Sequence, residues 1–344
     1  MLKIKVLPAG CGDCILISFG EEKDIKNILI DGGLGNVYPR ILKKEIERIK
    51  LAEQHIDLLV ITHSHTDHIN GIIKFIEDDE NNDCIKKVWF NSGVHFDREK
   101  VEMLTQHSGL NISATRIKYL EDKLVGMKFM QKNIWNNKLI KQGYVEKLYN
   151  ATLTVLSPDN QGLDKLKTFT KEHRNTNIAG NLDYDFSTKI ADFKLDEFIE
   201  DKSIENSTSI SFMFEYDDKK ILLLGDSFPR TVVDGLIKTK VLDENKHIDY
   251  VKLSHHASKG NLNDDLLEYI DCSNYIVSTN GNCTSKLPNK ETFARIVKHF
   301  HFTNLFFNYE NPILDKIFEN DKLETDDYKI NIVSLPKQNY EIEL

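Results

Sequence analysis

The sequence lacks the features that mark several classes of protein. Its 344 residues contain no apolar run long enough to cross a bilayer, so we expect no membrane contact. The first ten residues, MLKIKVLPAG, have the pattern of a strand and not of a secretory signal. No internal repeat, low-complexity tract or proline-rich linker divides the chain. These absences predict a cytoplasmic protein.

The chain also lacks a net positive charge and has few cysteines. The formal net charge is −9, which argues against a broad, nonspecific coat on nucleic acid, although bound cations or a local basic cleft would still permit phosphate contact. Of the five cysteines, Cys11 and Cys14 form a CxxC, but no second pair completes a four-sulfur zinc site. Small residues on and before a buried strand explain this pair better. The odd count, without a signal peptide, predicts free thiols.

The stretch ITHSHTDHING, residues 61–71, places three histidines and one aspartate within six positions. An apolar run, IDLLVI, precedes it, and apolar residues at helical spacing follow it. The pattern predicts a buried strand, a turn and an amphipathic helix. Imidazole and carboxylate ligands suit zinc, manganese or iron. We predict that His63 and His65 converge on one ion and that Asp67 and His68 face a second, the alternative being an ordinary histidine-rich turn.

Two aspartates end other predicted strands. In NILIDGG (27–33), the carboxylate of Asp31 can accept a hydrogen bond from a metal-bound histidine and fix its orientation. In KKILLLGDSF (219–228), Asp226 stands where a carboxylate can bridge two cations. Each motif taken alone is also an ordinary strand and turn.

A pair of histidines ends a further predicted strand, in DYVKLSHHASKG (249–260). Either His255 or His256 can be the remaining imidazole ligand of the second ion. We favour His256 as the ligand and His255 as an acid or orienting group. Lys259 can stabilise the charge of a leaving oxygen, although a solvated loop lysine is the alternative.

Strand and helix patterns occur in two successive sets along the chain. The predicted strands are 2–7, 13–19, 27–31, 56–61, 87–92, 151–156, 209–215, 220–224, 249–253, 274–278, 303–308 and 328–334. The predicted helices are 38–50, one directly after the histidines, 229–238, 263–270 and 290–300. This order predicts an α/β protein, an αββα sandwich of two mixed β-sheets flanked by helices.

The motifs IDGG, THSHTDHING, GDS and SHHAS, in this order, resemble those of the metallo-β-lactamase superfamily. With GCGDCILISF and NSTSI, they are more similar to its branch of ComEC-type competence proteins and related phosphodiesterases. The resemblance covers residues 1–95 and 205 to about 300. It implies one metallo-β-lactamase-like domain over residues 1–344, with a partly helical insertion at 97–205 that could act as a substrate lid.

The first metal site departs from the pattern of this family. Many members carry a histidine before the strand that leads to the bridging aspartate, whereas this chain has Asn206. The resemblance then implies three ligands for the first ion, His63, His65 and Asp226. A water or the Asn206 amide would complete the set. Two substitutes lie elsewhere in the chain, His95 and His173.

The resemblance implies a hydrolase with two divalent cations, zinc being favoured and manganese the alternative. Bridged by Asp226, the ions would generate a hydroxide that attacks phosphorus or a carbonyl. The predicted catalytic residues are Asp67, Asp226, His255 and Lys259. We favour phosphodiester cleavage in nucleic acid or a nucleotide. The alternatives are hydrolysis of a small ester, thioester or lactam, and a noncatalytic module that binds a protein partner.

The segment 97–205 is rich in lysine and aromatic residues. Several of them could line a cleft for a charged substrate that stacks, or form the core of a small helical subdomain. These residues are Lys128, Trp135, Lys138, Lys141 and Tyr144.

Overall fold

The computed structural model describes residues 1–92, 112–126, 132–135, 138–169, 183–242 and 244–344. His95, His173 and Lys128 lie outside the described residues. The chain divides into two compact units. The first contains Met1–Ile140, Asn160–Thr176 and Ile342–Leu344, and the second contains Lys141–Asp159 and Asn177–Glu341.

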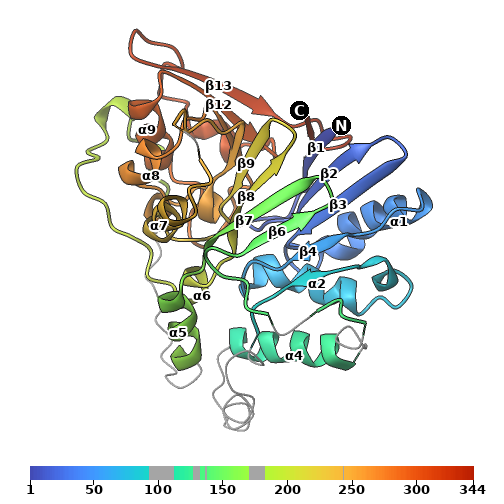
Figure 1. The fold of residues 1–344 in the computed structure, drawn as a ribbon. Coiled ribbons are helices and arrows are strands. Elements are labelled where there is room, and N and C mark those ends of the chain that lie inside the picture. The colour runs from blue at the N-terminus through green and yellow to red at the C-terminus, as the bar shows by residue number, and fades with distance from the viewer. Residues whose placement is uncertain (93–111, 127–131, 136–137, 170–182, 243) are drawn as a thin grey trace. The chain divides into compact units, whose positions relative to one another are not determined.

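The first unit is built on a six-stranded mixed sheet with the strand order β14-β1-β2-β3-β4-β5 (Figure 1). The bounds are β1 Leu2–Val6, β2 Ile15–Glu21, β3 Asp24–Ile30, β4 Leu58–Val60, β5 Val88–Trp89 and β14 Glu341–Glu343. Strands β1 to β3 pair antiparallel, whereas β3, β4 and β5 pair in parallel. Because parallel strands end at the same edge, Asp31 after β3 lies beside the histidine turn after β4.

The first unit also contains helices, of which α2 buries an apolar face. Their bounds are η1 Tyr38–Leu42, α1 Lys43–Leu51, α2 Thr66–Ile76, η2 Asn82–Cys84, α4 Ile112–Gly126 and α5 Asn160–Phe169. In α2, the residues at the predicted helical spacing are all buried, namely Ile69, Ile72, Ile73 and Ile76. The amphipathic helix predicted after the histidines is therefore confirmed.

The second unit contains an eight-stranded mixed sheet with the order β13-β12-β11-β10-β9-β8-β7-β6 (Figure 1). The bounds are β6 Val145–Leu148, β7 Ala151–Ser157, β8 Ser211–Tyr216, β9 Lys219–Leu223, β10 Tyr250–Lys252, β11 Asn274–Val277, β12 Phe302–Phe307 and β13 Lys329–Ser334. Strands β6 to β9 are antiparallel, and β9 to β13 are parallel. The parallel pairing of β9 with β10 brings the segments that follow them, with Asp226 and the histidine pair, to one sheet edge.

Helices also pack against the second sheet. Their bounds are η4 Ile190–Asp192, α6 Ile204–Ser207, α7 Pro229–Thr239, η5 Ser254–Ala257, η6 Lys259–Asn261, α8 Asp264–Glu268, α9 Lys290–His299 and η7 Leu314–Lys316. One apolar cluster joins strands to α7, α8 and α9. Gly235 in α7 allows the closest approach, since a Cβ atom there would lie 2.5 Å from the carbonyl oxygen of Leu156.

The prediction of two mixed sheets flanked by helices is confirmed. Every strand and helix predicted from the sequence is present, with ends that differ by a few residues. The sequence patterns missed β6, β14, α4, α5 and α6. Segment 97–205 includes β6 and β7, two strands of the second sheet, and its action as a lid stays a prediction. Among the residues that the structure describes, no helix is both long and apolar enough to traverse a bilayer.

The structure shows the state of the five cysteines. Cys14, Cys84 and Cys272 are buried free thiols, but Cys11 and Cys283 are disulfide-bonded, so free thiols were wrongly expected for these two. A disulfide depends on distances in the fold, which a residue count does not contain.

Trp135 is only 1% exposed, and its Nε1 donates to the Phe90 carbonyl at 3.2 Å. Trp135 is therefore not part of an exposed stacking surface, and the roles of the other residues named with it stay a prediction.

Asp78 ties the far end of α2 to η1 and α1. Its Oδ2 accepts hydrogen bonds from the Tyr38 hydroxyl at 2.7 Å, the Lys43 ammonium at 2.8 Å and the Asn81 amide at 3.0 Å. Burial opposes ionisation, but these donors together hold the pKa of Asp78 well below its usual value.

We predict that Asp78→Ala lowers the free energy of unfolding by about 1–3 kcal/mol at pH 7, because three donors lose their acceptor. The folded pKa is depressed, so this contribution is present above the unfolded pKa of about 4 and is lost as the pH falls further. Urea unfolding at several pH values measures the difference. The exposed neighbour Asp79→Ala is the control, and a difference that grew below pH 4 would contradict the prediction.

Candidate metal centre

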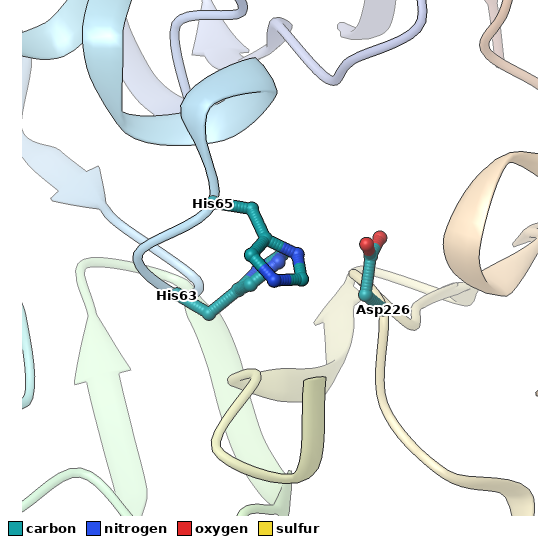
Figure 2. A group of neighbouring side chains, drawn as sticks. All are labelled: His63, His65 and Asp226. Atoms are coloured by element: carbon teal, nitrogen blue, oxygen red, sulfur yellow. The ribbon is translucent and has the colours of Figure 1, made fainter. Parts of the chain in front are cut away.

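The first histidines lie on the turn between β4 and α2. Strand β4 is fully buried, and His65 caps α2 with an extended backbone, which turns the chain sharply between the two elements. His63 is 4% exposed and His65 is half-buried. Their ring centroids lie 4.7 Å apart, and both rings project from this turn (Figure 2). The two imidazoles therefore lie side by side on this turn, and their convergence on one ion stays a prediction.

His68 and Asp31 form a buried pair. His68 Nδ1 lies 2.7 Å from Oδ2 of Asp31, and both side chains are 0% exposed. Asp31 also accepts hydrogen bonds from the Thr62 backbone amide at 2.8 Å and from the Thr62 hydroxyl at 2.6 Å. With the proton on Nδ1, the imidazole lone pair stands on Nε2, the nitrogen then suited to a metal. The predicted hydrogen bond between Asp31 and a histidine is present, and the role of His68 as a metal ligand stays a prediction.

Burial and hydrogen bonding act in opposite directions on Asp31. Burial raises the pKa of its carboxyl above the usual value, while His68 and the donors on Thr62 lower it. Its backbone adopts the left-handed region with φ 55°, which aspartate tolerates better than most residues. Gly32 and Gly71 allow α2 to approach this turn, since a Cβ atom on Gly71 would lie 1.8 Å from the Gly32 carbonyl oxygen.

Asp13 is a buried acid to which the sequence analysis assigned no role. Ligand atoms of Asp13, Asp31 and His68 all lie within 4.8 Å of one another. The Asp13 backbone amide donates to the carbonyl of Asp67 at 3.2 Å, and its carbonyl accepts from Gly33 at 2.8 Å. The motif GCGD that carries Asp13 was the available signal. Asp67 itself is half-buried in the first turn of α2.

In the second unit, Asp226 stands on the turn after β9 (Figure 2). It is 1% exposed, and its backbone amide donates to the Ser209 hydroxyl at 3.0 Å. Ser209 belongs to the predicted NSTSI motif, which explains why that motif accompanies the aspartate. The predicted place of Asp226, directly after a strand, is confirmed, whereas its burial was not predicted.

The histidine pair lies on a strained turn after β10. His255, His256 and Ala257 all adopt positive φ values, 47°, 55° and 65°, which L residues rarely do in succession. His256 Nδ1 lies 2.9 Å from the carbonyl oxygen of Ser278, so Nδ1 carries the proton. Its Nε2 then lies 4.0 Å from Oδ1 of Asp226. This tautomer leaves the lone pair that a metal would need on Nε2, and the choice of His256 as the ligand stays a prediction.

His255 faces the other oxygen of the same carboxylate. Its Nε2 lies 3.9 Å from Oδ2 of Asp226, and its Nδ1 lies 3.1 Å from Oδ1 of Asn261 and 3.4 Å from Oδ2 of Asp201. Burial alone would lower the pKa of His255, but the Asp226 and Asp201 carboxylates outweigh it and raise the pKa to about 9.

Asp201 and Asn261 were missed by the sequence analysis, because both stand outside recognisable motifs. The Asn206 amide donates to Asp201 Oδ2 at 2.6 Å, and the Asn261 amide donates to it at 3.2 Å. Burial opposes ionisation, but His255 and these amides hold the pKa of Asp201 below its usual value. Asn206, whose amide was considered above as a contact of the first ion, lies in the network around His255.

Lys259 lies apart from this network. Its ammonium is 3.1 Å from the Glu291 carboxylate, and the side chain is 42% exposed. Its predicted contact with a leaving oxygen stays a prediction.

The donor atoms of each unit fit a divalent cation. Imidazole nitrogens and carboxylate oxygens are ligands for zinc, manganese and iron. In His68 and His256, a hydrogen bond at Nδ1 directs Nε2 outward, as metal-binding histidines require. These ligand types do not distinguish between zinc, manganese and iron.

The sequence model of the Metallo-beta-lactamase superfamily matches residues 12–278. The chain belongs to this superfamily. The matched range includes the histidine turn, Asp226 and the histidine pair. No curated protein sequence matches this member of the superfamily.

Several solved structures resemble the chain over most of its length. YhfI from Bacillus subtilis, a metallo-β-lactamase fold protein, is 11% identical with a TM-score of 0.41, and the match covers 96% of this chain and 95% of YhfI. Tm1679, described as a metal-dependent hydrolase of the β-lactamase superfamily, is 12% identical with a TM-score of 0.41, over 100% and 99% of the two chains. CmlA, a diiron β-hydroxylase from Streptomyces venezuelae, is 11% identical with a TM-score of 0.38, over 99% and 54%. The family assignment rests on the superfamily match.

We predict that Asp31→Asn lowers the affinity for Zn²⁺ by about 10- to 100-fold, because the amide no longer fixes His68 as a carboxylate does. Isothermal titration of metal-free protein with Zn²⁺ measures the change. Asp57→Asn is a matched control, since Asp57 is also buried and accepts a backbone hydrogen bond, from Asn27 at 2.8 Å. Equal losses in both variants would show that Asp31 acts only on stability.

Proposed function

We propose that this protein is a dinuclear metal-dependent hydrolase that cleaves a phosphodiester bond in nucleic acid or a nucleotide. The observation that carries the proposal is the surroundings of Asp226. Each of its carboxylate oxygens has an imidazole nitrogen about 4 Å away, His256 Nε2 near Oδ1 and His255 Nε2 near Oδ2. A carboxylate with a separate nitrogen donor beside each oxygen is suited to bridge two cations.

The proposal assigns ligands from both units to the same two ions. His63 and His65 serve the first ion, Asp67 and His68 serve the second, and Asp226 serves both. The superfamily match supports this assignment, because it runs through both ligand sets. Zinc is the proposed metal and manganese the alternative.

The side chains of this protein would hold the two cations in position, and the cations would supply positive charge. Two bound cations would lower the pKa of a water molecule and take up negative charge that develops on a phosphoryl oxygen. Asp226 would set the spacing of the ions, and Asp31 would keep His68 in the required tautomer. The cations would also offset the net charge of −9 near an anionic substrate. The choice of a phosphodiester rests on the motif similarity to ComEC-type proteins and related phosphodiesterases.

A substrate panel tests the reaction class. Purified protein is assayed with Zn²⁺ or Mn²⁺ on single-stranded DNA, RNA, cyclic dinucleotides and bis(4-nitrophenyl) phosphate. A nitrophenyl ester, a thioester and a chromogenic lactam complete the panel. We expect turnover of the phosphodiesters and its loss after treatment with a chelator. Turnover of the ester, thioester or lactam alone would assign the site to small-molecule hydrolysis, and no turnover together with no bound metal would overturn the proposal.

Two substitutions test the ligand roles on the best substrate. We predict that Asp67→Ala and Asp226→Asn each lower kcat by more than about 100-fold, since ligands should matter more than the residues behind them. Asp226→Asn should be the more damaging, because it weakens the binding of both ions. Asp57→Asn controls for the loss of a buried carboxylate. An Asp226→Asn protein with full metal content and near-normal turnover would show that the active site lies elsewhere.

A further inference from the structure

The first ion of the proposed site has one histidine fewer than in many members of the family. His63, His65 and Asp226 serve it, and Asn206 occupies the place where many family members have a histidine. The Asn206 side-chain amide, however, donates to Asp201 at 2.6 Å and lies 3.3 Å from His255 Nδ1. Asn206 therefore supports His255, which suggests that a different residue supplies the missing imidazole.

We infer that His255 supplies this missing imidazole and that Asp201 is the positioning residue that holds it. The tandem histidines would then divide between the ions, with His255 on the first and His256 on the second. This inference rests on the proposed dinuclear function. It adds a ligand for the first ion and a role for a segment that the motif resemblance does not cover.

The positions of the two histidines around Asp226 support the assignment of His255 as a ligand of the first ion. His255 and His256 approach different oxygens of one carboxylate, with Nε2 distances of 3.9 Å and 4.0 Å. Side chains that are adjacent in an extended strand would point to opposite faces. The successive left-handed residues of this turn allow both rings to face Asp226. Such strain persists only where the surrounding structure holds it, and it is concentrated at functional sites.

The contacts of the second ring nitrogen, Nδ1, support the role of Asp201 as the residue that positions His255. Metal-bound histidines usually direct their second ring nitrogen at a carboxylate or a carbonyl. His256 uses the Ser278 carbonyl at 2.9 Å, and His255 has the Asp201 carboxylate at 3.4 Å and the Asn261 side-chain oxygen at 3.1 Å. Both histidines thus have the outer contacts of a ligand, supplied by different elements of the fold.

Asp201 is held firmly enough to position a ring. Its backbone amide donates to the Gly260 carbonyl at 3.0 Å, next to the histidine turn. Its Oδ1 accepts from the Ser203 amide at 2.8 Å, and its Oδ2 accepts from Asn206 and Asn261. A carboxylate already fixed by these contacts loses little further entropy when it orients His255.

The segment that precedes Asp201 is anchored on α9. Asp185 accepts hydrogen bonds from the first backbone amides of that helix, Lys290 at 2.8 Å and Glu291 at 3.1 Å. The buried Arg295 guanidinium donates to the Leu195 carbonyl at 3.1 Å and to Asp264 at 2.7 Å. Residues 183–201 thus form an anchored strap that ends at the carboxylate beside His255. The predicted insertion therefore contributes Asp201 to the network around a candidate ligand.

Metal analysis separates this role from that of a general acid, because a general acid can be removed without loss of metal. The wild-type protein should bind two Zn²⁺ per chain. We expect His255→Ala to lower the affinity for one ion by more than about 100-fold and to leave the other bound. Asp201→Asn should weaken the same ion by about 10- to 100-fold. Asp249→Asn is the matched control, since Asp249 accepts from the Lys220 amide at 2.8 Å and from the Lys219 ammonium at 3.1 Å.

A second variant keeps the test decisive if His255→Ala does not fold. In Co²⁺-loaded His255→Cys, a thiolate-to-cobalt charge-transfer band should appear only if the side chain at position 255 binds the ion. The Asp249→Asn protein loaded with Co²⁺ should lack the band. Two ions at wild-type affinity in His255→Ala, or no such band in His255→Cys, would overturn the inference and leave the dinuclear site intact. A wild-type protein that binds no metal would instead overturn the proposed function itself.

Discussion

The buried hydrogen bond between His68 and Asp31 is the interaction on which the first half of the site depends. Metal-binding histidines usually direct the second ring nitrogen at a fixed acceptor, and the Nδ1 of His68 has such an acceptor in a fully buried carboxylate at 2.7 Å. That carboxylate needs the left-handed backbone of Asp31 and the glycines after it, which let α2 approach the turn. The packing of α2 on the sheet and the orientation of the His68 ring are thus one constraint.

The second unit meets the same requirement with different chemistry. A backbone carbonyl holds His256, and a carboxylate with its amide partners faces His255. The carbonyl cannot titrate, whereas the carboxylate raises the pKa of its histidine. The two rings are therefore adjacent in sequence but lie in different electrostatic surroundings. The reason to assign them different ions is geometric, because their Nε2 atoms face different oxygens of the Asp226 carboxylate.

The anchored strap, residues 183–201, shows how a segment without motifs can matter to a site. Its contacts with α9 use buried charges: Lys290 donates to the Phe186 carbonyl, and Arg295 donates to the Leu195 carbonyl. Such groups are stable in a protein interior only when each is paired, so the strap and α9 hold each other in place. The result is a carboxylate, Asp201, in contact with the histidine turn.

The sequence by itself determined the superfamily, the order of the elements and most donor side chains. Hydrophobic periodicity placed β4 and α2, and the close spacing from His63 to His68 marked a metal site because few other structures need those residues there. Asp31 and Asp226 were also predictable, since carboxylates that end buried strands reach a shared sheet edge. Short-range patterns suffice for such features.

Only the tertiary structure decided the surroundings of the histidine pair. In the sequence His255 and His256 are neighbours of the same type, and nothing local separates them. Their difference arises from groups distant along the chain, Ser278 for one and Asp201 for the other. Asp201 in particular stands in a segment with no motif, and the strap that carries it is held by contacts about 100 residues away in sequence. Contacts of this range depend on how the chain packs, which neither residue spacing nor composition encodes.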